Sequence, residues 1–135
     1  MPVELSMSVL VVEDSRTMGQ IVRNLLTLIG FRHVDTVFDG ATALGKLREK
    51  HYGLVISDSN MQPMTGQTLL EAVRADRALS SIPFIMMTAE SNLVNVTAAK
   101  EAGANNYIVK PFTGEMLKEK IAAILTSGTT TRVLV

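Results

Sequence analysis

The strongest constraint on the fold is a set of four short apolar runs in which apolar and polar residues do not alternate. They span residues 9–12, 54–56, 84–87 and 107–109. Strands of a parallel sheet are buried on both faces and read as continuous apolar runs, so these segments predict parallel strands. A fifth run, residues 33–38, has only three apolar side chains and predicts an edge strand.

Amphipathic helical patterns separate these runs. The clearest apolar stripe steps by three or four residues and comprises Met18, Ile21, Val22, Leu25, Leu26 and Ile29. Ser15 can cap the start of this helix, and Gly30 suits its end. Weaker stripes follow the later strands, at Ala41, Leu44 and Leu47; at Leu69, Leu70 and Val73; at Val94, Ala98 and Ala102; and at Leu117, Ile121, Ile124 and Leu125.

The alternation of strands and helices indicates the fold class. Parallel strands need crossover connections, usually helices, so five such units predict an α/β three-layer sandwich with a five-stranded parallel sheet. The length of 135 residues and the apolar content of 47% suit one domain. We assign residues 1–128 to this domain and expect residues 129–135, at the end of a segment rich in Thr, Ser and Gly, to form a disordered tail.

Composition argues against several classes of function. Thirteen Lys and Arg balance thirteen Asp and Glu, so no net field would attract nucleic acid or an anionic membrane. The longest apolar stretches have five residues or fewer, far below the roughly 20 needed to cross a bilayer. Cysteine is absent, which excludes disulfides, and residues 1–8 lack the features of a secretion signal. We expect a cytoplasmic protein.

Polar side chains gather where the predicted strands end. In open parallel sheets the functional crevice lies beyond the carboxyl ends of the strands, so residues that follow different strands can form one site. The candidates that follow the first, third, fourth and fifth strands are Glu13 and Asp14, Asp58 and Asn60, Thr88 and Glu90, and Lys110.

The charges of these candidates predict a cation. Two carboxylates 4 Å apart repel by about 4 kcal/mol at an effective dielectric constant of 20, so three converging carboxylates need neutralisation. Lys110 can supply one positive charge, and Mg²⁺ with oxygen ligands can supply more. A carboxylate beside Mg²⁺, a lysine and a hydroxyl can accept a phosphoryl group, and Asp58 is the predicted nucleophile. Each residue alone could be a helix cap or surface charge, but the joint pattern favours a site.

These residues, in this order on these strand ends, closely resemble the receiver domain of bacterial two-component response regulators, in particular the stand-alone CheY-like chemotaxis regulators. The resemblance extends over about residues 10–125. The most similar runs are residues 21–26, 56–58, 88–90 and 109–112. The resemblance implies a flavodoxin-like fold with strand order 2-1-3-4-5 and a cis Lys110–Pro111 bond.

The resemblance also implies a role for each candidate. Asp58 is the implied phosphoacceptor. Asp14 and Asp58 would bind Mg²⁺ directly, Glu13 would complete the acidic pair, and the backbone carbonyl of Asn60 would be a further ligand.

Further residues are implied to act on the phosphoryl group or to transmit its presence. Lys110 would contact that group, and Thr88 and Tyr107 would form the switch. Asn60 and Glu90 occupy positions that set the lifetime of the phosphorylated state in CheY.

Three features depart from the CheY pattern. Glu13 stands where an aspartate is commoner, and the proline after the phosphoacceptor is displaced to Pro63. Asn92 and Leu93 replace a pair of lysines, which weakens the case for binding to the flagellar motor.

The predicted function is that of a single-domain response regulator that is not an enzyme. A CheA-like histidine kinase would phosphorylate it, and it would act as a monomer on an output protein such as a flagellar switch component, with a phosphatase as a further partner. Neither nucleic acid nor a membrane is an expected partner. The main alternative is a phosphorelay shuttle or phosphate sink. A Mg²⁺-dependent aspartyl-phosphate phosphatase and an FMN-binding flavodoxin-like protein are less favoured alternatives.

Overall fold

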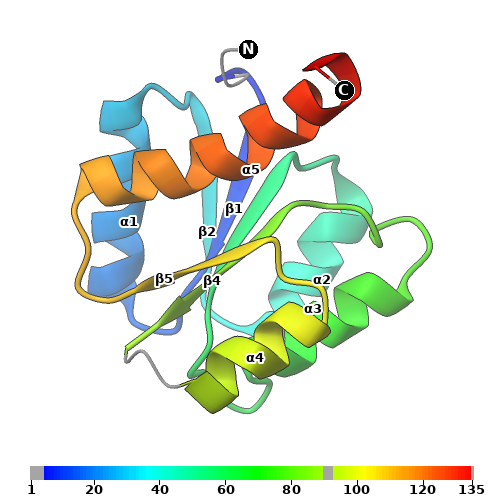
Figure 1. Ribbon diagram of the computed structural model, residues 1–135. Coiled ribbons are helices and arrows are strands. Elements are labelled where there is room, and N and C mark those ends of the chain that lie inside the picture. The colour runs from blue at the N-terminus through cyan, green and yellow to red at the C-terminus, as the bar shows by residue number, and fades with distance from the viewer. Residues whose placement is uncertain (1–4, 90–92, 135) are drawn as a thin grey trace.

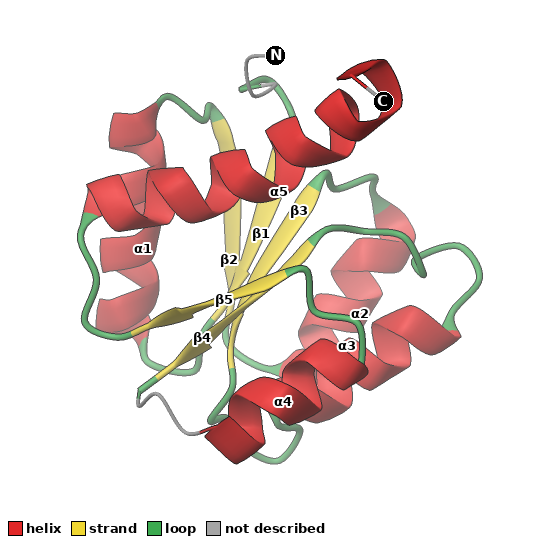
Figure 2. Ribbon diagram, viewed as in Figure 1, coloured by secondary structure: helices red, strands yellow, loops and turns green. Residues whose placement is uncertain are grey.

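The chain folds into a five-stranded parallel sheet between two layers of helices, as a computed structural model that describes residues 5–89 and 93–134 shows (Figures 1 and 2). The elements, in chain order, are β1 Ser8–Val12, α1 Arg16–Ile29, β2 His33–Val37, α2 Gly40–Glu49, β3 Leu54–Asp58, α3 Gly66–Ala75, β4 Phe84–Thr88, α4 Leu93–Glu101, β5 Asn106–Val109 and α5 Gly114–Leu134. The strand order is β2-β1-β3-β4-β5, so the predicted fold class and strand order are confirmed.

The continuous apolar runs become strands that are covered on both faces. Every residue of the neighbouring central strands β3 and β4 is buried. The weaker run forms β2 at one edge of the sheet, where His33 is exposed and only Val34 and Val37 are buried. The prediction of an edge strand is confirmed, and the difference in apolar content follows from the difference in burial.

Two apolar cores lie on opposite faces of the sheet, one under α1 and α5 and the other under α2, α3 and α4 (Figure 2). Successive residues of β1 face opposite cores, so Val9 and Val11 pack with α1 and α5 while Leu10 and Val12 pack on the other side. Successive side chains of a strand point to opposite faces of the sheet. A strand that is covered on both faces therefore needs apolar residues at every position.

The predicted ends of α1 are confirmed. The Ser15 side chain accepts a hydrogen bond from the backbone N–H of Met18 at 3.2 Å, which satisfies one of the unpaired donors of the first turn. At the other end the N–H of Gly30 donates to Leu26 and Thr27 carbonyls, and its φ of 125° is one that glycine adopts without steric cost.

Two helices bury side chains that their predicted apolar stripes do not include, although the predicted Leu44, Leu47 and Ala102 also pack against the core. In α2 the buried side chains include Ala43 and Leu47, whereas Ala41 is exposed. In α4 they are Val96 and Ala99, with Ala98 only half-buried. The sequences of both helices are rich in alanine, whose small apolar area defines a face weakly, so packing of the larger neighbours decides the orientation.

Helix α5 extends beyond the point at which the sequence predicts a disordered tail. That tail was expected over residues 129–135, but the backbone is helical from Gly114 to Leu134. Extending an existing helix costs far less than nucleating one, which lets α5 continue through a segment of poor helix formers. At 21 residues α5 is the longest helix, and no helix in the described ranges combines the length and apolar character that crossing a membrane requires.

Arg74 joins three segments at the amino-terminal edge of the sheet. Its guanidinium donates to the carbonyls of Ile82 at 2.7 Å and Gly103 at 2.8 Å, and to Asn105 Oδ1 at 3.0 Å. Asn105 Oδ1 also accepts from the backbone N–H of Phe84 at 2.7 Å. Helix α3 is thereby fastened to the start of β4 and to the α4–β5 connection.

We expect the substitution Asp35→Asn to reduce the loss of folding stability that occurs as the pH falls into the acidic range. Tyr52 donates a 2.6 Å hydrogen bond to Asp35, and this bond, assisted by Lys50, lowers the pKa of that carboxyl. The Asp35 carboxylate therefore stabilises the fold fully above its unfolded pKa of about 3.9, and this contribution is lost as the pH falls through the lower folded value.

Urea denaturation at a series of acidic pH values measures this effect. The wild-type protein should lose more stability than Asp35→Asn over that window. Tyr52→Phe, which keeps the carboxylate but removes its main donor, should fall between them. Identical pH profiles for all three proteins would show that the Tyr52–Asp35 contact does not contribute to the pH dependence of stability.

We expect Gly66→Ala to destabilise the protein by about 1–3 kcal/mol, because the site at the start of α3 has no room for a side chain. A Cβ atom there would meet the carbonyl oxygen of Asp58, and would lie 2.8 Å from Ser59 Cα. Gly45, within α2, is the matched control because a Cβ there would have no neighbour within 4 Å. Gly45→Ala should stabilise by about 0.5–1 kcal/mol. Denaturation curves that rank the two variants the other way would contradict this packing argument.

Candidate functional site

Backbone hydrogen bonds bring the ends of neighbouring strands to one edge of the sheet. The N–H of Glu13 donates to the Val37 carbonyl at 3.0 Å, just beyond β1 and β2. The N–H of Ser59 donates to Met87 at 2.8 Å, and the N–H of Lys110 donates to the Thr88 carbonyl at 2.7 Å. Residues far apart in the sequence thus follow the carboxyl ends of adjacent strands, as the sequence predicts.

Three carboxylates converge at this edge. Each of Glu13, Asp14 and Asp58 offers an oxygen, and these three oxygens lie within 4.8 Å of one another. Glu13 and Asp58 are 2% and 4% exposed, whereas Asp14 is exposed. Two of the three charges are therefore removed from water, which is costly unless a cation accompanies them.

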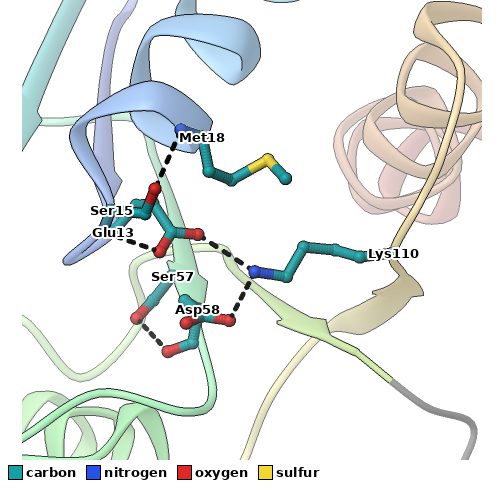
Figure 3. Close-up of polar contacts among 6 residues, drawn as sticks. All are labelled: Glu13, Ser15, Met18, Ser57, Asp58 and Lys110. Atoms are coloured by element: carbon teal, nitrogen blue, oxygen red, sulfur yellow. Dashed lines mark hydrogen bonds and ion pairs between the residues drawn. The ribbon is translucent and has the colours of Figure 1, made fainter.

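Lys110 supplies that cation from the end of β5 (Figure 3). Its Nζ donates a 3.1 Å hydrogen bond to Glu13 Oε1 and lies 3.0 Å from Asp58 Oδ1. The other oxygen of Glu13 accepts from the backbone N–H of Ser15 at 3.2 Å. One lysine thus bridges two buried carboxylates, and its side chain is only 17% exposed.

The surroundings of Glu13 and Lys110 raise the pKa of both groups. Burial raises the pKa of Glu13 and outweighs the opposing hydrogen bonds from Ser15 and Lys110, while the charge of Asp58 raises it further. Burial alone would lower the pKa of Lys110, but its contacts with Asp58 and Glu13 prevail and raise that pKa. Lys110 therefore stays protonated at neutral pH.

Asp58 lies within this cluster. Its Oδ1 is buried and lies 3.0 Å from Lys110 Nζ, as an ion pair. A buried carboxylate with a single cationic neighbour, close to oxygens of Glu13 and Asp14, suits a small divalent cation. All the donors are hard oxygen atoms, so the residues present fit Mg²⁺.

Thr88 and Tyr107 line one cavity of about 410 Å³ between the sheet edge and α4. Thr88 is buried at the end of β4, and Tyr107 is half-buried on β5 with Lys120 Nζ 4.9 Å from its ring centre. Asn60 lines the same cavity. The structure therefore brings the two predicted switch residues and Asn60 together around one space.

Two of the predicted positions lie outside the described residues. These are Glu90, the predicted lifetime residue, and Asn92, the first residue of the pair that replaces two lysines. Both stay predictions. The implied cis Lys110–Pro111 bond is present, and the bond before the displaced Pro63 is cis as well.

Sequence reasoning missed two contributors to this region. Ser15 was predicted only as a helix cap, yet its N–H also binds Glu13. Gln67 lines the cavity and donates to the Ala98 carbonyl at 3.2 Å, which links α3 to α4. The adjacency of Ser15 to Glu13 could have indicated the first contact, but no signal in the sequence indicates the second.

Comparisons with known proteins agree with this geometry. The model of the response regulator receiver domain family matches residues 9–122. Chemotaxis protein CheY of Pseudomonas aeruginosa is 45% identical over 118 residues, which cover 87% of this chain and 95% of the relative. Chemotaxis protein CheY-3 of Vibrio cholerae is 44% identical over 119 residues, which cover 88% of this chain and 92% of the relative.

A solved structure shows the same fold. The crystal structure of chemotaxis protein CheY4 of Vibrio cholerae matches with a TM-score of 0.84 at 34% identity, and the match covers 89% of this chain and 99% of the other. Proteins of this kind are signalling regulators rather than conventional enzymes, and they interact with histidine kinases and output proteins. With a matching family model, close relatives over most of its length and the strand order 2-1-3-4-5, this chain belongs to the response regulator receiver domain family.

Proposed function

We propose that Asp58 accepts a phosphoryl group from a histidine kinase, with Mg²⁺ bound beside it, and that the phosphorylated chain signals by binding another protein. The observation that carries the proposal is the buried Asp58 carboxylate, which lies 3.0 Å from Lys110 Nζ and shares its surroundings with two further carboxylates. A carboxylate that served only to stabilise the fold would not need two other acids beside it.

The transfer step balances without an additional reactant. A carboxylate oxygen of Asp58 forms a bond to phosphorus while the bond from phosphorus to the nitrogen of the donor phosphohistidine breaks. The electron pair of that bond stays on the nitrogen, which takes up a proton. Lys110, already aimed at Asp58, would then pair with an oxygen of the transferred group.

Asp14, Asp58 and the backbone carbonyl of Asn60 would hold the Mg²⁺, with Glu13 as the second acid of the pair. When bound, Mg²⁺ supplies positive charge that neutralises the phosphoryl oxygens and orients them for in-line transfer. Because Glu13 is engaged by Lys110 and by Ser15, we propose that it contacts the metal through water.

The output would come from the neighbouring switch residues. The Thr88 hydroxyl, at the end of β4, can donate a hydrogen bond to a phosphoryl oxygen on Asp58, and the cavity beside it can admit the Tyr107 ring. A change in Tyr107 alters the surface near β5 and α5, where a partner would read it.

We propose chemotaxis as the process, with a CheA-like kinase and a flagellar switch component as partners. Support comes from the two relatives at 44–45% identity, which are both named chemotaxis proteins. Within the same family, the phosphorelay shuttle stays the alternative, because a shuttle would use the same Asp58 chemistry.

We expect acetyl phosphate and Mg²⁺ to add one labile phosphoryl group to the wild-type chain, as measured by intact-protein mass spectrometry. Asp58→Asn should remove the adduct, and so should chelation of the metal. Asp35→Asn is the matched control, because it removes a carboxylate that lies outside the cluster, on β2. An adduct that survives in Asp58→Asn, or no adduct in any sample, would overturn the proposal.

We expect Lys110→Met to slow adduct formation by about 100-fold, the usual effect of losing one aimed donor in an active site. The variant also leaves the carboxylates of Glu13 and Asp58 buried together without their cation. Its melting temperature should therefore fall, and added Mg²⁺ should restore more of it than in the wild type.

Lys118→Met removes an exposed lysine from α5 and is the control for a general change in charge. It should match the wild type in both measurements. Equal phosphorylation rates for Lys110→Met and Lys118→Met would show that Lys110 has no part in the transfer.

A further inference from the structure

The cavity beside the phosphorylation site has walls of opposite character. The connection from β3 into α3 contributes Ser59, Asn60, Thr65 and Gln67, which are all polar. Helix α4 lies next to α3 on the same side of the sheet (Figure 1). A molecule held between the two helices would therefore meet several hydrogen-bonding groups on this side.

The opposite wall is apolar. Helix α4 contributes Val96, Ala98 and Ala99, and the strands add Met86 and Tyr107. Sulfur and aromatic edges both favour contact with the face or edge of another aromatic ring. Small alanine side chains on α4 leave the space that a larger residue would fill.

The size and charge of the cavity restrict what it can hold. Its volume of about 410 Å³ falls within the range of about 300–1,000 Å³ that small-molecule sites occupy. None of the described lining residues carries a charge. An ion would lose hydration there without gaining an opposite charge from these residues, so an uncharged ligand is favoured.

We propose that the cavity between α3 and α4 binds a small uncharged aromatic molecule that carries one hydrogen-bonding group, with the size and chemistry of indole. The ring packs against the α4 wall and Met86, and the N–H faces the polar wall. Gln67 is the best-placed anchor, because its side chain already bridges the two walls through the Ala98 carbonyl. The site differs from the acidic cluster in both its residues and its ligand.

A second part of the inference, which rests on the proposed function, is that this ligand opposes phosphorylation. Thr88 and Tyr107 line the cavity, and the Tyr107 ring can enter it only when the cavity is empty. Ligand binding and phosphorylation therefore exclude each other in part. By linkage, each weakens the other by the same factor.

Titration of the full-length chain with indole tests the site. The chain contains no tryptophan, so indole fluorescence reports binding without a tryptophan background. We expect saturable binding by the unphosphorylated protein with a Kd on the order of 1 mM or below, as for other small ligands of few atoms. In ¹H–¹⁵N spectra the shifted amides should cluster around Gln67, Ala98 and Ala99.

Two substitutions on α4 form a matched pair. Ala98→Leu places a larger side chain in the cavity and should weaken indole binding at least tenfold. Thr97→Leu changes an exposed neighbour that does not line the cavity, and its affinity should equal that of the wild type. Absence of saturable binding, amide shifts elsewhere on the molecule, or unchanged affinity in a folded Ala98→Leu would overturn the site.

A separate measurement tests whether ligand binding and phosphorylation oppose each other. Protein phosphorylated with acetyl phosphate should bind indole several-fold more weakly than untreated protein, whereas treated Asp58→Asn should show no change. Equal affinity of phosphorylated and untreated protein would overturn the coupling and leave the site standing. If mass spectrometry shows that the chain does not become phosphorylated, both the proposed function and the coupling are overturned. Indole binding by untreated protein would still show whether the cavity is a binding site.

Discussion

The contact of one lysine with two buried carboxylates is the interaction on which the functional edge of the sheet depends. Lys110 reaches from the end of β5 to Glu13 beyond β1 and to Asp58 at the end of β3, so it joins strands that are not neighbours. A buried carboxylate without a partner would be costly, and two of them would repel. The positive charge of the lysine offsets the repulsion between these carboxylates and allows both to be buried.

Much of the fold and of the site's composition could be predicted from the sequence. Continuous apolar runs identify parallel strands because such strands are buried on both faces, and the weak run at residues 33–38 identifies the edge for the same reason. The rule that functional residues follow the carboxyl ends of strands then groups Glu13, Asp58 and Lys110. Strand order is not contained in periodicity, and it was predicted only through the family resemblance.

The structural features that the sequence does not predict depend on packing between helices and strands. The faces of α2 and α4 are predicted only in part: Leu47 and Ala102 pack against the core as predicted, but Ala43 and Ala99 are buried too and Ala41 is exposed, because alanines give weak preferences. The link from Gln67 to the Ala98 carbonyl needs two helices at a set distance, which no local pattern encodes. The roles of Asp58, Thr88 and Tyr107 in phosphorylation and switching remain predictions, because arrangement alone does not show reactivity.

The two ends of the strands are held by different kinds of contact. At the amino-terminal edge, Arg74 and Asn105 tie α3, β4 and the segment after α4 into one unit. At the opposite edge the strands end in charges and a cavity. Gly103, which Arg74 holds, lies just beyond the end of α4, and Gln67 holds the Ala98 carbonyl within that helix. Because Arg74 and Gln67 both belong to α3, we expect α3 and α4 to move together as one unit.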